Sequence, residues 1–394
     1  MTGTETGRKE RLLTGYTGRL LIAVSVGWAL IQTGRLVVSP LLPAISADLG
    51  ISSTQAGFAI TTIWGIYALL QYPSGRLSDQ LSRTTLLVGG LLLVSAGFLA
   101  LGGAPTYLTF LAGAVVVGLG AGLYPTPARG LVSDLFVERR GQAFGLHTAS
   151  GDVGGILAAG LGTVVLAVAV WRGAFLPVVV VLLAVALSLH LWSREGYELE
   201  RVDLAVVATG KRLFAVPQLR WLLLAYALYA FTWQSAVGFL PTYLLSKGLP
   251  PAIANAGFAA LFVVGAVVKP LAGGLGDKVP RGLLAPGVLA LAAAALAVVV
   301  TASTTVLVLA GVAVFSGGLM AYPPVMQAHL MDSFPSDSMG GDLGAMRSFY
   351  IGIGSLGSTY VGAMGQYLSY DLAFAGLVGC LLLSSTLIVT RGRE

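Results

Sequence analysis

The sequence predicts an all-α membrane protein in which twelve transmembrane helices form two pseudo-symmetric six-helix bundles. The first observation behind this prediction is composition. Of the 394 residues, 56% are hydrophobic and only 10% are charged, and the mean hydropathy is +0.85. An ordinary soluble domain is about 25% charged. The second observation is an internal repeat of half the chain length, described below.

Twelve apolar segments are long enough to cross a bilayer, because a transmembrane helix needs about 20 mostly apolar residues. The residues before the first segment are polar and basic, and that segment is too long for a cleavable signal sequence. It is therefore expected to remain as the first span. The segments lie at 20–42, 55–76, 84–104, 107–132, 143–170, 174–192, 221–245, 252–275, 282–302, 306–331, 343–367 and 371–390.

The positions of Lys and Arg predict the orientation, because cytoplasmic loops retain positive charge. With both termini inside, seventeen of the 23 Lys and Arg residues are cytoplasmic, and only Arg172 and Lys247 fall outside. We therefore expect a multi-pass protein of the cell (cytoplasmic) membrane, surrounded by lipid and monomeric. The net charge of +6 follows from this topology. A nucleic-acid partner is not expected, because the chain lacks a basic face.

The internal repeat is clearest in two basic loops. The loop after the second span reads 75-GRLSDQLSR-83, and the loop after the eighth reads 273-GGLGDKVPR-281, an offset of 198 residues from 75 to 273. So many coincidences at one offset indicate a duplication. The predicted units are an N-terminal bundle with a short cytoplasmic tail (1–192), a cytoplasmic linker (193–220) and a C-terminal bundle (221–394).

The first of these loops resembles the signature loop of the major facilitator superfamily, and the second loop echoes it. The pattern Gly-x-Leu-x-Asp-x-x-x-Arg matches at Gly75, Leu77, Asp79 and Arg83. The resemblance covers essentially the whole chain. It implies the major facilitator fold and transport by alternating access, with the substrate bound near the membrane midplane between the two halves.

Charges in the repeat predict a cytoplasmic gate. In each half, the loop arginine is expected to pair with the acid that ends the fourth span of that half, and the loop aspartate to face the positive N-terminus of a helix. The alternative is that these charges only fix topology. The predicted gate residues are Asp79, Arg83 and Asp134 in the first half and Asp277, Arg281 and Asp332 in the second.

Polar and aromatic stripes follow one face of several spans, at the three- and four-residue spacing of a helix. Such a stripe is expected to face a watery cavity or another helix, although aromatic side chains at this spacing also serve packing. The stripes are Ser25, Trp28, Gln32, Arg35 and Ser39 in the first span, Trp64, Tyr67 and Gln71 in the second, and Tyr226, Tyr229 and Trp233 in the seventh.

Four cations lie within spans, against one clearly intramembrane acid, Asp152. Unpaired desolvated charge is costly, so this excess favours an anionic ligand. The planar fork of arginine suits carboxylate or phosphate, because it donates two parallel hydrogen bonds. The predicted substrate-binding residues are Arg35, Arg129, Gln32, Trp64, Tyr67, Tyr229, Trp233, Lys269 and Arg347.

Structural alternatives remain open for three of these cations. Arg35 could pair with a helix-end carbonyl near Pro40, and Arg129 could form an ion pair with Asp134. Lys269 could extend its long side chain to the membrane interface.

Asp152 is the predicted proton-coupling residue, with His147 and His329 as further candidates. A lone intramembrane carboxylate can alternate between its protonated and ionised forms. It could equally neutralise Arg35 or Arg129. No metal or cofactor is expected, because Cys380 is the one cysteine and the histidines lie in separate spans without metal-ligand spacing.

A closer resemblance is to the anion:cation symporter and organophosphate:phosphate antiporter branches of the superfamily. It is carried by an arginine eight residues before Pro43, by 125-PTPARGLVSDLFVERRGQAFG-145 and by 171-WRGAF-175. Members of those branches use a first-span arginine for the anionic group of the substrate, and by that pattern Arg35 and Arg129 carry the contact. The acid that often precedes this arginine in the symporters is Gly34 here, which shifts the expected proton site to Asp152.

We therefore expect a secondary transporter of a small organic anion, either a carboxylate or a phosphate ester, coupled to H⁺ or Na⁺. One alternative is a proton-driven drug or metabolite efflux antiporter, although the efflux signature of the fifth span is only half present as 151-GDVGG-155. A non-transporting membrane sensor of the same fold is the other. An enzyme is not expected, since the sequence has no nucleophile–base or metal constellation.

Overall fold

The structure is a computed structural model that describes residues 11–331 and 339–391, except 169, 199 and 201–216. Every regular element in these residues is helical, which confirms the predicted fold class. The N-terminal half contains α1 (Gly15–Leu36), α2 (Val38–Leu49), α3 (Ser53–Leu69), α4 (Gln71–Gln80), α5 (Arg83–Gly102), α6 (Tyr107–Leu123), α7 (Pro125–Leu135), α8 (Arg140–Val168), the short 3-10 helix η1 (Trp171–Ala174) and α9 (Phe175–Trp192).

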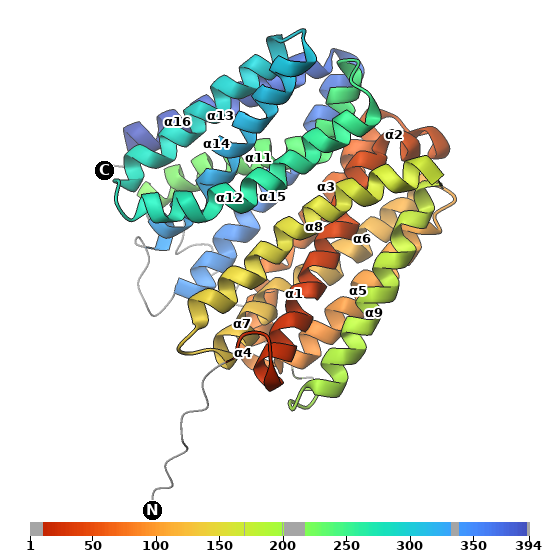
Figure 1. Cartoon of the computed structure of the whole chain (residues 1–394), viewed down its shortest axis with the longest axis vertical. Helices are drawn as coiled ribbons and strands as arrows, with labels where there is room; N and C mark the ends of the chain where they lie inside the picture. Colours follow the sequence, from red (N-terminus) through yellow and green to blue (C-terminus); the bar gives the residue numbers. More distant parts are fainter. Residues whose placement is uncertain (1–10, 169, 199, 201–216, 332–338, 392–394) are drawn as a thin grey trace, which may run out of the picture.

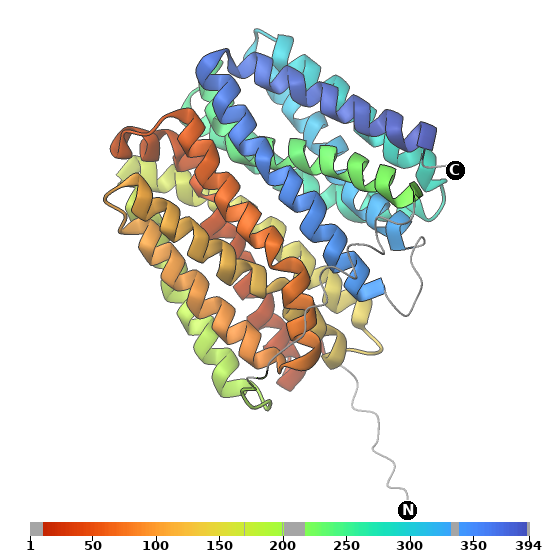
Figure 2. The same ribbon diagram turned by 180° about the vertical axis from the view of Figure 1, so that it is seen from behind.

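In the described part of the C-terminal half there are six long helices, and each covers one predicted span. They are α11 (Pro217–Ser246), α12 (Pro251–Gly276), α13 (Arg281–Thr301), α14 (Thr305–Met331), α15 (Met339–Tyr367) and α16 (Tyr370–Arg391). In the N-terminal half the first, second and fourth spans are each made of two consecutive helices, which meet at Val37, Leu70 and Tyr124. Figures 1 and 2 show the two halves as two bundles, the first coloured red to yellow-green and the second green to violet-blue.

Ten helical segments among the described residues are long and apolar enough to cross a membrane. The two predicted spans outside this set are α3 with α4, and α15. These helices pack against each other along the junction of the two halves. Both carry many Ser, Thr, Gln and Gly residues, which are typical of membrane helices that pack closely against other helices.

The helices define two faces of the molecule. We call the N-terminal face the end at which α1 begins. The turns from α4 to α5 and from α7 to α8 lie at this end, near the start of α1 in Figure 1. The opposite face carries the turns from α2 to α3 and from α15 to α16.

A seam of hydrogen bonds joins the halves, and it is densest toward the opposite face. The Thr54 hydroxyl donates to the Gln366 side chain at 2.7 Å, and the Tyr370 hydroxyl lies 3.0 Å from the Ser53 oxygen. Deeper in the membrane, the Thr61 hydroxyl donates to the Ser355 carbonyl at 2.6 Å. The chain is thus held closed on this side of its centre.

Small residues allow the close approach of α3 and α15 along this seam. A side chain at Gly57 would collide with the backbone of α15, because its Cβ would lie only 3.0 Å from the carbonyl carbon of Ser358 and from the Cα of Thr359. Membrane helices pack closely through such residues, because the bilayer supplies no hydrophobic drive between them. Gly57 is therefore a requirement of the closed seam.

Candidate functional site

A cavity of about 340 Å³ lies between the two halves, near the middle of the helices. Side chains of α1, α3, α7 and α8 line it from the N-terminal half, and side chains of α11, α12, α14 and α15 from the C-terminal half. The lining residues are Trp28, Gln32, Trp64, Tyr67, Arg129, Thr148, Tyr226, Tyr229, Ala230, Trp233, Gln234, Lys269, Met320, Pro323, Pro324, Gln327, Arg347, Tyr350 and Ile351.

Eight of the nine predicted substrate-binding residues lie in this wall; they are Gln32, Trp64, Tyr67, Arg129, Tyr229, Trp233, Lys269 and Arg347. The prediction did not include Gln234, Gln327 and Tyr350. None of these three extends a stripe that was read from the sequence. Trp28 and Tyr226 belong to the predicted stripes, so the three- and four-residue spacing was enough to find them.

Arg35, the ninth predicted residue, is buried behind the wall. Its guanidinium carbon lies 3.8 Å from the ring centroid of Trp64 and 4.1 Å from that of Tyr67. Its Nη1 donates to the Gln32 side-chain oxygen at 3.2 Å, and its Nε and Nη2 have no hydrogen-bond partner among the described residues. In this conformation Arg35 supports two rings of the cavity wall and does not itself line the cavity.

The wall is strongly aromatic and is built from both halves. Trp64 of α3 meets Trp233 of α11 edge to face, with ring centroids 5.2 Å apart. On the C-terminal side, the rings of Tyr226 and Tyr350 lie 4.1 Å apart. Aromatic faces at such distances favour a planar ligand between them, because rings gain from offset stacking and edge contacts.

Two arginines bring positive charge into the cavity from different halves. Arg129 comes from α7 and Arg347 from α15, and they are close enough to repel each other. The Nε of Arg347 is buried and has no hydrogen-bond partner among the described residues. Asp134, the structural partner considered for Arg129, contacts Arg83 at 3.4 Å. An anion placed between Arg129 and Arg347 would relieve their repulsion.

Lys269 and Asp152 form an ion pair across the junction of the halves. The Nζ of Lys269 on α12 lies 2.5 Å from the Oδ1 of Asp152 on α8. Lys269 therefore points inward, in place of the extension to the membrane interface that was considered. The partner of Asp152 is Lys269, in place of the two arginines considered from the sequence.

A side recess of about 150 Å³ adjoins the main cavity around this ion pair. Besides Asp152 and Lys269, it is lined by His147 and Arg129. His147 is 2% exposed, its ring lies 6.5 Å from that of Trp28, and its Nδ1 has no partner among the described residues. The side chain of His329 lies outside the described residues.

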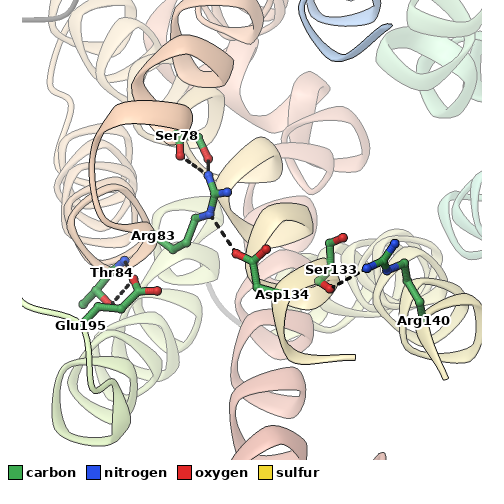
Figure 3. Close-up of polar contacts among 7 residues, drawn as sticks. All are labelled: Ser78, Arg83, Thr84, Ser133, Asp134, Arg140 and Glu195. Carbon is green, nitrogen blue, oxygen red and sulfur yellow. Dashed lines mark hydrogen bonds and ion pairs between the residues drawn. The ribbon is translucent and has the colours of Figure 1, made fainter. Parts of the chain in front are cut away.

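The predicted gate in the first half contains the expected ion pair. Figure 3 shows Arg83, at the start of α5, between Ser78 and Asp134. The Arg83 guanidinium packs over Gly130, where a Cβ would lie only 2.8 Å from its Cζ atom. The pair joins α5 to α7 and therefore lies within the N-terminal half.

In the second half, the described ion pair lies within the loop itself. Arg281 Nη2 lies 3.8 Å from Asp277 Oδ1, four residues earlier in the chain. Asp332 and the side chain of Asp79 lie outside the described residues. Across the part of the chain that the structure describes, no group of three or more His, Cys, Asp and Glu residues is placed to hold a metal ion.

Comparison with known proteins places the chain in a family. Residues 24–359 match the profile of the Major Facilitator Superfamily. A gentisate transporter of Corynebacterium glutamicum is 27% identical over 376 residues, which cover 89% of this chain and 81% of that protein. A puromycin resistance protein of Streptomyces alboniger is 30% identical, over 36% of this chain and 29% of that protein.

Among solved structures, a bacterial homologue of the human lysosomal transporter Spinster, in an inward-facing and occupied conformation, has the same fold. Its TM-score is 0.82 at 18% identity, covering 96% of this chain and 97% of that one. Three observations point to the same family. They are the internal repeat, the two six-helix halves with a cavity between them, and the matched profile. The chain belongs to the Major Facilitator Superfamily and is a multi-pass membrane transporter.

Proposed function

We propose that this transporter moves a small organic anion, most readily an aromatic carboxylate, across the cell membrane by alternating access and in symport with protons. The observation that carries the proposal is the cavity itself. Arg129 and Arg347 supply positive charge from both halves, within a wall of tryptophan and tyrosine rings, and neither forms an ion pair with another described residue.

The size and chemistry of the cavity support a compact cargo. Its volume of about 340 Å³ lies at the lower end of the range of ligand pockets, roughly 300–1,000 Å³. A carboxylate would accept paired hydrogen bonds from an arginine fork. A flat ring would lie against Trp64 and Trp233, and the side chains of Gln32 and Gln234 offer hydrogen bonds to ring hydroxyls.

The relatives support the same class of cargo. The gentisate transporter aligns over most of this chain, and gentisate is a benzoate with two hydroxyl groups. The puromycin resistance protein aligns over 36% of the chain, and a positively charged cavity disfavours cationic drugs. Efflux of a drug is therefore the alternative outcome of the test below.

Proton coupling is proposed through Asp152. Its side chain is 7% exposed and lies beside the cavity. A carboxylate so placed can gain and lose a proton as its surroundings change during the transport cycle. We further propose that the charges around Arg83 and Arg281 stabilise the N-terminal face during this cycle, each through an ion pair within its own half.

A substrate panel tests the proposed function. Purified protein in proteoliposomes is offered labelled gentisate, benzoate, glycerol 3-phosphate and puromycin. The expected result is saturable uptake of the labelled carboxylates. Unlabelled gentisate should inhibit this uptake. Transport of puromycin but not of carboxylates would indicate a drug efflux protein. Binding of an anion without transport would indicate a sensor.

Alternating access also gives a prediction for the seam between α3 and α15. Gly57→Ala is expected to disfavour the state closed at the opposite face, because the added Cβ meets the backbone of Ser358 and Thr359. The cavity should then become accessible from that side. The measurement is labelling of a cysteine introduced by Thr148→Cys, in a Cys380→Ser background, with an impermeant thiol reagent.

The matched control is Gly89→Ala in α5, where a Cβ meets nothing within 4 Å. We expect severalfold faster labelling from the opposite face in Gly57→Ala and no change in Gly89→Ala. Equal labelling rates in the two variants would show that the seam tolerates a side chain at this position.

A further inference from the structure

We propose that Lys269 is the residue at which substrate binding and proton binding are coupled. The carboxylate of the anion replaces that of Asp152 as the partner of the Lys269 ammonium group, and Asp152 takes up one proton and becomes the neutral acid. This inference rests on the proposed function, because it requires an anion in the cavity.

The geometry gives the two partners unequal access to the cavity. Lys269 lines both the main cavity and the side recess, whereas Asp152 lines the recess alone. The Lys269 side chain is 28% exposed and that of Asp152 only 7%. An anion in the main cavity therefore reaches the ammonium group directly, while the Asp152 carboxylate stays covered on its far side.

Among the described residues, three further ionisable groups lie near Asp152. Arg129 of α7 and His147 of α8 line the same recess, and Tyr229 of α11 is near enough to interact with the carboxylate electrostatically. The neighbouring residues of α1 in the recess are Trp28 and Gln32, which do not titrate. Lys269, Arg129 and His147 are thus the described basic groups that share the recess with Asp152.

Each partly loaded form leaves a buried charge without its partner. If the anion takes Lys269 while Asp152 stays ionised, the Asp152 carboxylate is buried and unpaired. If Asp152 is protonated without an anion, the Lys269 ammonium group loses its partner while Arg129 lines the same recess. Breaking a buried ion pair on one side only is strongly unfavourable. The empty ionised form and the form with both anion and proton are therefore favoured together.

Charge balance follows from the exchange. One proton binds Asp152 for each carboxylate that pairs with Lys269, so the net charge of the recess and its ligand is unchanged. Binding of the two is reciprocal, since each raises the affinity for the other by the same factor. Because the ion pair joins α8 to α12, the same exchange removes a direct link between the halves.

Proton uptake on binding tests this inference without any transport measurement. Gentisate is titrated into the full-length protein in detergent, by calorimetry in two buffers with different ionisation enthalpies and at several pH values. The wild-type protein is expected to take up close to one proton per gentisate, with affinity falling about tenfold per pH unit at alkaline pH.

The variants separate coupling from a structural role. Asp152→Asn is expected to bind gentisate with no proton uptake, with an affinity independent of pH and higher than wild type at alkaline pH, because Lys269 is then free. Lys269→Gln should bind weakly at every pH. The control Asp371→Asn removes an acid that lies 3.3 Å from Lys247 near the opposite face, and should keep the wild-type proton uptake.

Two results would overturn this inference but leave the proposed function intact. One is gentisate binding by the wild type without proton uptake, and the other is an Asp152→Asn affinity that is lowered equally at all pH values. Failure of every anion in the panel to bind would overturn the proposed function and this inference with it. The two failures are distinguishable, because only the first kind leaves measurable anion binding.

Discussion

Arg347→Gln is expected to abolish uptake of an organic anion while the protein remains folded. The Arg347 guanidinium lines the cavity opposite Arg129, and its buried Nε has no partner among the described residues. A hydrogen bond to a charged group is worth about 1.5–3 kcal/mol, so losing one such contact weakens binding roughly tenfold to 150-fold. Loss of a bidentate contact exceeds this range.

The thermal stability of Arg347→Gln, unlike its uptake, is not expected to fall. Arg129 and Arg347 repel each other across the cavity, so removing either charge relieves this repulsion. The thermal unfolding midpoint of Arg347→Gln is expected to equal or exceed that of the wild type. Arg347→Lys keeps the charge without the fork and should recover only part of the affinity.

The control for this prediction is Arg140→Gln at the N-terminal face. Arg140 donates to the backbone carbonyls of Phe136 and Ser133, and it does not line the cavity. Its replacement should leave gentisate affinity unchanged. Wild-type affinity in Arg347→Gln would mean that the anion binds elsewhere.

Arg35→Met is the second replacement with a large expected effect. Methionine fills much of the space of the arginine stem, so folding should survive, but the cation between Trp64 and Tyr67 is lost. A desolvated cation–π contact is worth about 2 kcal/mol. Without it the two rings lose their fixed positions, and the cavity loses a buried positive charge directly behind its wall. We expect gentisate affinity to fall at least tenfold.

Two further variants resolve what Arg35 contributes. Arg35→Lys restores charge but cannot lie flat against both rings, so it should recover transport only partly. Arg35→Ala removes charge and volume together and should also lower the thermal unfolding midpoint, because a buried hole remains. Normal uptake by Arg35→Met would show that neither the charge nor its stacking on the rings matters for transport.

The fold was predictable because it rests on patterns that repeat locally along the chain. Hydropathy located the helices, and the recurrence of 75-GRLSDQLSR-83 revealed the two halves. Helical spacing likewise placed Trp28 and Gln32 of α1 in one wall, as the structure has them. The first two predicted spans end too early, at residues 42 and 76. The structure continues the helices to Leu49 in α2 and to Gln80 in α4, and these ends were missed because they are polar.

Pairings between distant segments were not predictable. The partner of Asp152 is Lys269, 117 residues away and in the other half, and no local spacing encodes that contact. Arg35 shares a face with Gln32, yet the rings of Trp64 and Tyr67 from α3 cover it. Which side of a stripe meets a cavity depends on the neighbouring helix, and a single sequence does not record that helix's position.

The proposed function requires that this transporter use a proton gradient to accumulate a small organic anion. The most direct measurement is uptake of labelled gentisate into proteoliposomes that are more alkaline inside than outside, with the membrane potential clamped at zero. We expect gentisate to accumulate above its external concentration, to lose this accumulation when a protonophore is added, and not to accumulate in Arg347→Gln. Uptake that stops at the external concentration, or that a sodium gradient drives and a proton gradient does not, would rule out proton-driven accumulation.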